Sequence, residues 1–461
     1  MSHRNAPRNS FLCYNIFMIY GHTFWGVAGN VFTGRSGVGI IMDKKTAVHK
    51  IQHNTERTIH TFQFIIFAIL CGLLIGVIGV LFHECIDYVT ELRLAHPQIL
   101  LLLPFGAVLI LFLYRRTGRG AEGGTNLIIS SIQSGKTVPL RMAPLIFIAT
   151  TISHLAGASV GREGAALQLG GSIGHYIASA FRFSERDRKT LIMTGMSAAF
   201  SAMFGTPLAA AVFPMEVVSV GIMHYSSLLP CTIASFVAHG VAVKMGGSSP
   251  FYELGNIPAL GIKSGISVLI LALLSGFLSW IFCATLQAGE HIAEHYLKNG
   301  YVRALILGSV LLLYTWLSRG QIYNGAGSGS IVSFIAGEGP KMAFLFKMVF
   351  TILSICAGYK GGEIVPSFFI GAAFGRLFGA LSGFSPSLCA AVGMGAVFCG
   401  VTNSPISSFI ICCEMFGFEG SAYFLLACVI SYVVSGYYGL YTSQKIMYSK
   451  FRLSYIDKRT L

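Results

Sequence analysis

Residues 157–174 read GASVGREGAALQLGGSIG and place two adjacent charged residues, Arg162 and Glu163, between long apolar segments. If these segments span a membrane, each charge costs roughly 2.5–3.5 kcal/mol unless it pairs, faces a cavity or carries a function. Gly161 and Gly164 allow the backbone to bend and to approach a ligand closely. A helix that begins just after Gly161 would direct unpaired N–H groups and the positive end of its dipole toward that ligand. The stretch therefore predicts an anion site beside a carboxylate.

The amino-acid composition indicates an integral membrane protein. Of the 461 residues, 54% are hydrophobic and 11% are charged, whereas a soluble domain usually carries about 25% charged residues. The Lys and Arg residues behind the formal net charge of +14 stand mainly at the ends of apolar segments, as membrane topology requires. No basic stripe interleaved with aromatic residues is present, so nucleic acid is not an expected partner. We expect a multi-pass protein of the cell membrane (cytoplasmic or inner), surrounded by the lipid bilayer.

The sequence carries no pattern for a metal or another cofactor. The 11 cysteines lie mostly inside apolar runs and lack C-x-x-C or Cys/His metal spacing. They are interpreted as small buried hydrophobic residues. His83 and Glu84 are followed by Asp87, which does not complete the zinc motif H-E-x-x-H. We therefore expect neither a metal site nor a cofactor.

Several apolar segments are too short for a straight membrane span. Runs such as 62–82 and 262–282 are long enough, whereas Gly/Ala/Ser-rich pieces such as 165–180 and 393–401 fall below the roughly 20 residues that a span needs. Irregular backbone at membrane depth is tolerated only beside protein or a cavity, so interrupted segments indicate broken helices that line a site. The sequence predicts an all-α polytopic membrane protein.

The chain contains an internal repeat. GMSAAF at 195–200 precedes Glu216, and GMGAVF at 393–398 precedes Glu414 at the same spacing. Repeated halves in transporters place the substrate between them, near the middle of the membrane. The repeat therefore predicts two structurally similar halves with a shared site.

Two further matches extend the repeat toward the N-terminus. Gly161 and Glu163 of GREGA correspond to Gly361 and Glu363 of GGEIVP, and GTNLI, which begins at Gly124, has its counterpart near residue 327. We divide the chain into an N-terminal cytoplasmic or poorly ordered segment, two membrane repeat halves and a short C-terminal tail, at residues 1–59, 60–250, 251–450 and 451–461. The first 41 residues lack a hydrophobic core and a cleavage site, so a signal peptide is not expected.

The repeated motifs resemble those of the CLC superfamily of anion channels and proton-coupled anion exchangers. GREGA at 161–165 resembles the family motif GREGP, GGEIVP at 361–366 resembles GxFxP, and GTNLI at 124–128 resembles GSGIP. This resemblance covers residues 60–450. It implies a CLC-type inverted-topology repeat whose broken and partial helices meet at a midplane anion site. It also implies a homodimer with one pathway in each subunit.

The departures from the chloride-handling pattern are similar to those of the fluoride/proton antiporters, the CLC-F branch. That branch carries G-x-N-L-I, here with Asn126, and K-G-G-E-[IV]-x-P, here with Glu363. Val217 stands where chloride/proton exchangers often have a second proton-transfer glutamate. Thr125 and Val365 differ from the CLC-F branch, which more usually has Met or Asn at the first position and Thr at the second.

Helix N-termini and backbone amides can hold an anion without a full positive charge, so the ion can still leave. The glycine-rich turns before residues 125, 163 and 363 would each present such a helix end. Thr125 and Tyr441 could add hydroxyl donors; alternatively, Thr125 caps a helix and Tyr441 is an interfacial aromatic residue. The predicted anion-binding residues are Gly124, Thr125, Asn126, Gly161, Arg162, Gly164, Gly362, Ile364 and Tyr441.

Glu163 is interpreted as the proton-linked gate, because an ionised carboxylate can occupy an anion position and a protonated one can swing away. A salt bridge from Glu163 to Arg162 is the alternative, although neighbours on a helix do not face each other. Glu363, in the equivalent turn of the second half, is the second coupling carboxylate. Glu216 and Glu414 are expected to be structural and to cap or pair near helix ends.

Three functions are consistent with these residues. The first is a proton-coupled antiporter that exports fluoride in exchange for protons. The second is a chloride/proton exchanger or a chloride channel of the same fold. The third, a membrane-embedded enzyme with Glu163 and Glu363 as an acid/base pair, is disfavoured because no nucleophile, metal set or cofactor loop accompanies the carboxylates. We therefore do not expect an enzyme.

Overall fold

A computed structural model describes residues 44–117, 123–247, 251–255, 257–318 and 320–461. The expectations for residues 1–43 lie outside this part of the chain. The chain divides into two compact units at Thr61, and the side chains and contacts discussed below belong to the second unit, Phe62–Leu461. The proposed division of the membrane part into two halves stays a prediction.

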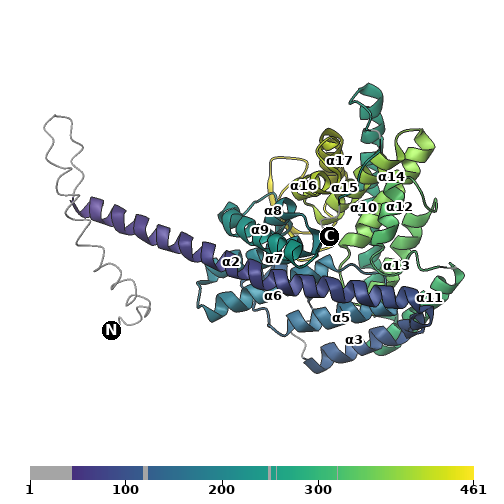
Figure 1. Cartoon of the computed structure of the whole chain (residues 1–461), viewed down its shortest axis with the longest axis horizontal. Helices are drawn as coiled ribbons and strands as arrows, with labels where there is room; N and C mark the ends of the chain where they lie inside the picture. Colours follow the sequence, from purple (N-terminus) through teal and green to yellow (C-terminus); the bar gives the residue numbers. More distant parts are fainter. Residues whose placement is uncertain (1–43, 118–122, 248–250, 256, 319) are drawn as a thin grey trace. The chain divides into compact units, whose positions relative to one another are not determined.

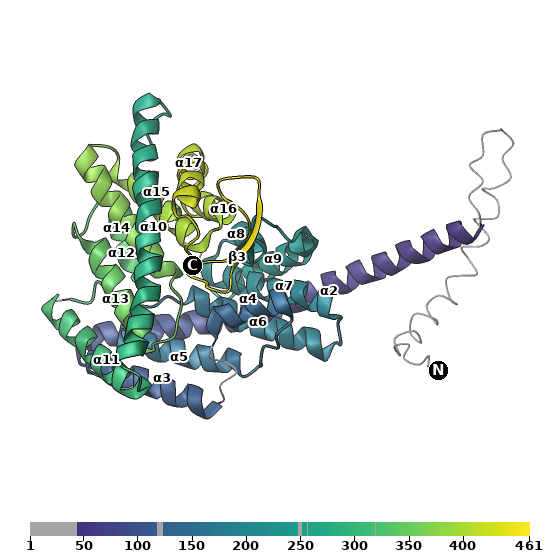
Figure 2. The same cartoon turned by 180° about the vertical axis from the view of Figure 1, so that it is seen from behind.

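The described chain is predominantly helical, and Figures 1 and 2 show its helices from opposite sides. In chain order the helices are α2 (Lys44–Ala95), the 3-10 helix η1 (Pro97–Leu102), α3 (Leu103–Thr117), α4 (Gly124–Ser134), α5 (Met142–Ala156), α6 (Glu163–Ala180), α7 (Glu185–Phe204), α8 (Pro207–Val217), the 3-10 helix η3 (Tyr225–Ser227), α9 (Leu228–Lys244), α10 (Ile262–Tyr296), α11 (Gly300–Leu317), α12 (Ser328–Ile335), α13 (Ala343–Ala357), α14 (Ile364–Ser382), α15 (Pro386–Thr402), α16 (Pro405–Phe416) and α17 (Ser421–Val434).

The chain contains both long and short helices, as the interrupted apolar segments predicted. Among the described residues, six helical stretches are long and apolar enough to cross a membrane, among them Thr58–Ala95 and Ile262–Tyr296. Apolar helices such as α8 and α16 have only 11 and 12 residues, which is too short for a straight span. The prediction of a polytopic helical fold with partial helices is confirmed.

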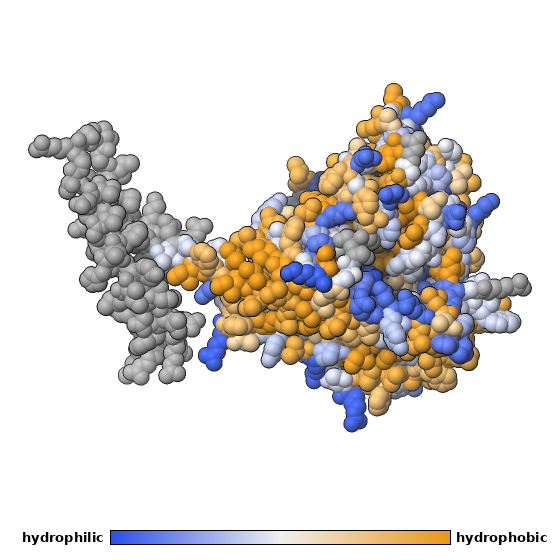
Figure 3. All heavy atoms as spheres, in the orientation of Figure 1, coloured by the Kyte–Doolittle hydropathy of each residue, from blue (hydrophilic) through white to orange (hydrophobic). Residues whose placement is uncertain are grey.

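The surface of α2 is apolar on its outer side as well as its inner side. Phe62, Ile66 and Leu81 are each more than half exposed, whereas Ala68 and Ile75 are fully buried. Figure 3 shows apolar side chains gathered over the face along which α2 runs. Lipid tails are as apolar as leucine, so such a helix can face the bilayer on one side and pack against protein on the other.

The helix pairs α5–α6 and α13–α14 are each joined by a similar glycine-containing turn. α5 ends at Gly157 (φ 95°) and α13 ends at Gly358 (φ 98°), both in the left-handed conformation that glycine adopts without strain. The chain then turns and begins α6 at Glu163 and α14 at Ile364. The predicted helix starts after the two glycine-rich turns are confirmed.

Glycines also allow the helices behind these turns to pack closely. A Cβ at Gly170 of α6 would lie 2.2 Å from the Gly195 carbonyl oxygen of α7. In the same way, a Cβ at Gly371 of α14 would lie 2.4 Å from the Gly393 carbonyl oxygen of α15. Both distances are shorter than any side chain tolerates, so the small residues set how near the helices approach.

A small three-stranded sheet adds to the helical fold. β1 (Ser219–Val220) pairs in parallel with β2 (Lys445–Tyr448), and β2 pairs in antiparallel with β3 (Tyr455–Arg459). Residues 451–461, expected to be a short tail, therefore contain a paired strand (Figure 2). The side chain of Gln444 anchors the sheet, because its Nε2 donates to the carbonyls of Val217 and Thr402, each at 2.9 Å.

Candidate functional site

The two glycine-rich turns pair with each other. Gly161 N donates to Gly362 O at 2.5 Å, and Gly362 N donates to Gly161 O at 2.7 Å, which forms an antiparallel bridge. A Cβ at Gly164 would lie 2.7 Å from the Cα of Gly362. The bridge brings the N-termini of α6 and α14 together, and no larger residue fits at the contact.

The Glu163 side chain is folded back against the start of its own helix. It is 3% exposed, and its Oε2 accepts a hydrogen bond from the backbone N of Arg162 at 2.9 Å. The Nε of Arg162 lies 3.6 Å from Glu163 Oε1. Our expectation that these neighbours do not face each other is wrong, because Arg162 is the N-cap residue and lies outside the helix. The salt bridge and the predicted gate therefore involve the same carboxylate.

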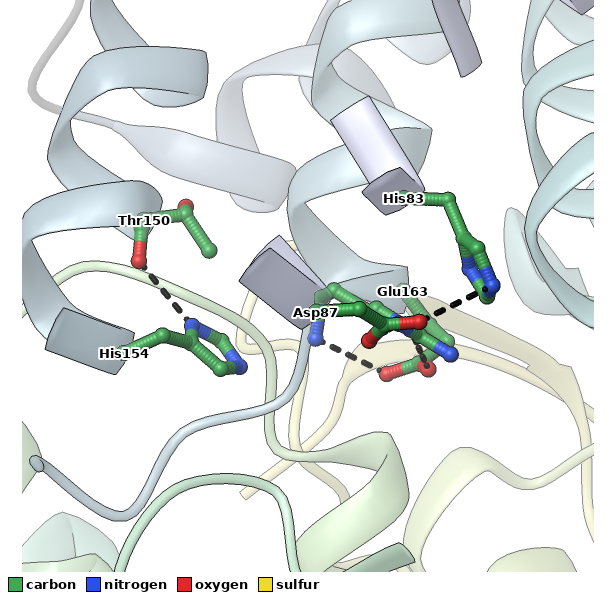
Figure 4. Close-up of polar contacts among 6 residues, drawn as sticks. His83, Asp87, Thr150, His154 and Glu163 are labelled. Atoms are coloured by element: carbon green, nitrogen blue, oxygen red, sulfur yellow. Dashed lines mark hydrogen bonds and ion pairs between the residues drawn. The ribbon is translucent and has the colours of Figure 1, made fainter. Parts of the chain in front are cut away.

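Arg162 also links Glu163 to α2. Its Nη1 donates to Asp87 Oδ1 at 2.5 Å, and Asp87 Oδ2 lies 3.2 Å from His83 Nε2. Figure 4 shows His83, Asp87 and Glu163 in this chain of polar contacts. In the sequence, His83 and Asp87 stand only in an incomplete zinc motif, and the contact of Asp87 with Arg162 is not predicted. The two residues are four apart in an apolar helix and therefore lie on one face of it. This spacing could have predicted that they interact.

Glu363 is the N-cap residue of α14 and is half-buried, without a side-chain cap hydrogen bond to the helix. Lys360 lies in the same turn, and its Nζ stands 5.4 Å from the centre of the Tyr114 ring. The backbone of Lys360 is held by Ser153, whose Oγ donates to the Lys360 carbonyl at 2.7 Å. Electrostatic interactions reach Glu363 from Lys360 and from Glu290. Ile364 is the first residue of the helix and is buried.

The start of α4 lies against α6. Thr125 Oγ1 accepts from Gln168 Nε2 at 3.1 Å and lies 3.4 Å from the Gly164 carbonyl, to which it can donate. The N-cap of α4 is Gly123, so the alternative interpretation of Thr125 as a capping residue is wrong. Asn126 Oδ1 accepts from the backbone N of Ser443 at 3.0 Å. The Asn126 amide therefore holds the loop that follows Tyr441.

Tyr441 is inside the protein. Its side chain is 2% exposed, and its hydroxyl has no hydrogen-bond partner among the described residues. The interpretation of Tyr441 as an interfacial aromatic residue is therefore wrong. The loop that follows Tyr441 is held against the start of α4 by the hydrogen bond from Ser443 N to Asn126 Oδ1. The assignment of Tyr441 to the anion site stays a prediction.

Glu216, which lies in α8, caps α16, and Glu414, which lies in α16, caps α8. Glu216 accepts from Ile406 N at 3.0 Å and Ser407 N at 2.8 Å at the start of α16. Glu414 accepts from Leu208 N and Ala209 N, each at 2.8 Å, at the start of α8. The expectation that both carboxylates are structural caps is confirmed.

Residues 105–436 match the sequence model of the family described as voltage gated chloride channel. The chain belongs to this family, the CLC family. The resemblance inferred from the repeated motifs is confirmed. The described residues contain no group of three or more His, Cys, Asp or Glu side chains that could hold a metal ion.

Relatives of this CLC protein transport different anions. The chloride/fluoride channel protein of Pseudomonas syringae pv. tomato is 35% identical over 395 residues, which cover 84% of this chain and 87% of the relative. The H(+)/Cl(-) exchange transporter ClcA of Vibrio campbellii is 26% identical over 406 residues, 80% of this chain and 85% of the relative. Both relatives are named for the movement of anions across a membrane, one as a channel and one as an exchange transporter.

Solved structures agree with the family assignment. A CLC-type fluoride/proton antiporter is 29% identical with a TM-score of 0.81, and the match covers 83% of this chain and 98% of that chain. A slow cyanobacterial Cl-/H+ antiporter is 19% identical with a TM-score of 0.71, covering 81% of this chain and 94% of that chain, and shows the common fold. The predicted CLC-type fold is confirmed.

Proposed function

We propose that this CLC protein is an antiporter that exports fluoride in exchange for protons. The observation that carries the proposal is the Gly161–Gly362 bridge, which joins the turns that bear Glu163 and Glu363. Two carboxylates on either side of one backbone contact are placed so that the protonation of each can depend on whether an anion occupies the space between them.

The anion would be held by groups that replace its water without binding it too tightly. The N-termini of α6 and α14 converge at the bridge and supply backbone N–H groups and positive dipole ends. Tyr441 supplies a buried hydroxyl that lacks a partner among the described residues. A buried donor without a partner costs about 1–3 kcal/mol, so an anion that accepts from it relieves that cost.

The proton would travel on Glu163. In its present position the ionised carboxylate takes the Arg162 N–H that an anion could otherwise use. Protonation weakens this hydrogen bond and the attraction to the Arg162 guanidinium, so the side chain is free to swing away and admit an anion. Glu363, half-buried at the start of α14, would receive or supply the proton on the other side of the bridge.

Two motifs of the sequence and the names of two similar proteins favour fluoride over chloride as the transported anion. Glu363 stands where the chloride-handling pattern has an apolar residue, and the GTNLI motif carries Asn126 and lacks the loop serine of that pattern. The relative at 35% identity and the solved structure at 29% identity are named for fluoride. Chloride/proton exchange is the second candidate, since the Vibrio campbellii relative carries out that reaction. We further propose that the chain works as a homodimer in the cell membrane.

The test is anion efflux from proteoliposomes, with a fluoride or chloride electrode and a pH electrode in the same chamber. Fluoride efflux should be accompanied by proton uptake into the vesicles and should exceed chloride efflux. Glu163→Gln and Glu363→Gln should each abolish coupled proton movement, whereas the exposed Glu338→Gln should leave it unchanged. Equal rates for chloride and fluoride would overturn the fluoride assignment, and proton coupling that survives Glu163→Gln would overturn the gate.

A further inference from the structure

A cavity of about 430 Å³ lies beside the gate, between α2, the end of α5 and the start of α12. Its lining includes Arg162, whose guanidinium contacts the Glu163 carboxylate. Other lining residues that the following argument uses are Asp87, Arg93, His154, Asn324 and Ser328. The cavity is thus separated from the Glu163 carboxylate only by the Arg162 side chain, and apart from Arg162 the proposed transport cycle uses none of these lining residues.

Arg93 is a buried cation that lines this cavity without a full set of partners. Its side chain is 2% exposed, and neither Nε nor Nη1 has a hydrogen-bond partner among the described residues. A buried guanidinium that is not paired is strongly unfavourable, because it loses hydration and gains no compensating charge. The two unpaired donors therefore point to a ligand with negative charge.

The start of α12 faces the same cavity. Its N-cap is Gly327, in the left-handed conformation with φ 86°, and no side chain caps the helix. Ser328, Gly329 and Ser330 of the first turn line the cavity. An uncapped helix N-terminus presents unpaired N–H groups and a positive dipole end, which favour an anion in front of them.

The remaining charges leave the cavity positive. Lys347 lies behind the loop that leads to α12, fully buried, and its Nζ donates to Gly325 O at 2.7 Å. Arg93 flanks the same loop, since a Cβ at Gly325 would lie 3.2 Å from its Nη2. The one acidic lining residue, Asp87, is already bound by Arg162 and His83. Arg93 is consequently left without a protein carboxylate in the lining.

His154 contributes a hydrogen-bond acceptor to the lining of the cavity. Its Nδ1 lies 2.9 Å from the Thr150 carbonyl (Figure 4) and must donate to it. In the neutral imidazole this makes Nε2 an acceptor, and Nε2 has no partner among the described residues. Asn324 Oδ1 is a second acceptor without a described partner. These two acceptors suit water molecules that accompany an ion.

We propose that this cavity is a second anion site, in which a small inorganic anion with part of its hydration shell waits between Arg93 and the N-terminus of α12 before it passes Arg162 to the gate. The inference rests on the proposed anion transport but not on which halide is carried. It assigns Arg93 and α12 to the capture of the ion, whereas Glu163 and Glu363 govern its coupling to protons.

Efflux kinetics test the site in proteoliposomes of the full chain. Arg93→Gln should raise the KM for the transported anion about five-fold or more, the loss expected for one charge-assisted hydrogen bond, with kcat within about two-fold. Arg376→Gln is the matched control, because Arg376 is also buried, donates to Pro340 O and does not line the cavity. An unchanged KM in folded Arg93→Gln protein would overturn the proposal.

Ser328→Glu tests the same site without removing a buried residue. Ser328 is exposed at the first position of α12, where a carboxylate stabilises a helix, so the variant should fold. The added negative charge should raise the KM at least as much as Arg93→Gln does. Wild-type kinetics for Ser328→Glu would contradict an anion at the helix end.

Bromide gives a direct readout, because its anomalous scattering locates it in crystals of the full chain. A bromide peak between Arg93 and the start of α12, lost in Arg93→Gln, supports the site, and an empty cavity at saturating bromide overturns it. The result is separable from the proposed function. A transporter that carries chloride instead of fluoride would still show the KM effect, and a fluoride antiporter without this site would not.

Discussion

Gly161 and Gly362 exchange two backbone hydrogen bonds, so the turns that carry Glu163 and Glu363 form one structural unit. A change in one turn must therefore reach the other through rigid backbone rather than through flexible side chains. The contact also explains why the two motifs tolerate no bulk, since a Cβ at Gly362 would lie 2.5 Å from the N of Gly164.

Gly362→Ala should disrupt transport more than its single added methyl group suggests. The new Cβ would collide with backbone atoms of Gly164, which cannot rotate away. We expect a loss of about 1–3 kcal/mol in the free energy of unfolding, as for other overpacked sites, and a loss of most coupled efflux. Thermal unfolding in detergent and proteoliposome efflux measure the two effects.

Gly240→Ala is the matched control for this substitution. Gly240 is exposed in α9, and a Cβ there would meet nothing within 4 Å. Alanine should stabilise this helix by up to about 1 kcal/mol and leave efflux unchanged. If Gly362→Ala behaves like Gly240→Ala, the close contact between the turns is not required.

Glu216→Gln and Glu414→Gln should lower stability without removing proton coupling. Each carboxylate accepts two backbone N–H groups at a helix N-terminus, and an amide offers only one oxygen there. We expect a loss of about 2 kcal/mol in the free energy of unfolding for each variant, because charge-assisted hydrogen bonds are lost. The loss should be larger for Glu216, which also accepts from Ser407 Oγ at 2.6 Å.

The ratio of protons to anions, recorded with two electrodes, is the decisive measurement for these caps. It should match the wild type in both variants at a temperature where they are folded. A changed ratio in Glu216→Gln would mean that Glu216 carries protons, contrary to its assignment as a cap.

The sequence predicted the features that depend on local pattern and on the repeat. Glycine before Glu163 and before Glu363 was enough to expect helix starts there, because glycine terminates one helix and frees the next turn. The identical spacing to Glu216 and Glu414 was enough to expect equivalent roles. Both expectations rest on short motifs that occur twice in the sequence.

Contacts between distant segments could not be predicted in the same way. The repeat matches Gly161 with Gly361, whereas the backbone pairs Gly161 with Gly362, and nothing in the sequence indicates that these two turns touch. Arg93 is similar, because a lone arginine near the end of an apolar helix is usually interfacial, and only the packed structure shows that it is 2% exposed. The strand at residues 455–459 was not predicted either. Its partner β2 is short, and the sequence does not indicate that the two segments pair.

Gln444→Leu should detach the C-terminal sheet from the helices. The Gln444 side chain is fully buried, and its amide serves the carbonyls of Val217 and Thr402 and accepts from Asn403 Nδ2 at 2.9 Å. Leucine has a similar size but leaves these groups unpaired, so we expect a loss of about 2–4 kcal/mol in the free energy of unfolding. Amide hydrogen exchange should accelerate in β2 and β3.

Gln133→Leu provides the comparison for Gln444→Leu. Gln133 is half-buried and makes a single hydrogen bond of this kind, from its Nε2 to the Val218 carbonyl at 2.8 Å. Its loss should cost about 0.5–1.5 kcal/mol and leave exchange in β2 and β3 unchanged. Equal effects of the two variants would show that Gln444 is not the anchor of the sheet.

Tyr441→Phe and Tyr359→Phe should separate a hydroxyl that serves the anion from one that serves the fold. Tyr441 has a buried hydroxyl with no partner among the described residues, whereas the buried Tyr359 hydroxyl donates to the Leu103 carbonyl. Tyr441→Phe removes an unsatisfied group, so stability should hold or rise, while the KM for efflux should increase about five-fold for one lost hydrogen bond to the anion. Tyr359→Phe removes one hydrogen bond to the Leu103 carbonyl and should cost about 0.5–1.5 kcal/mol in the free energy of unfolding with the KM unchanged. An unchanged KM in Tyr441→Phe, measured beside the destabilised Tyr359→Phe, would remove Tyr441 from the anion site.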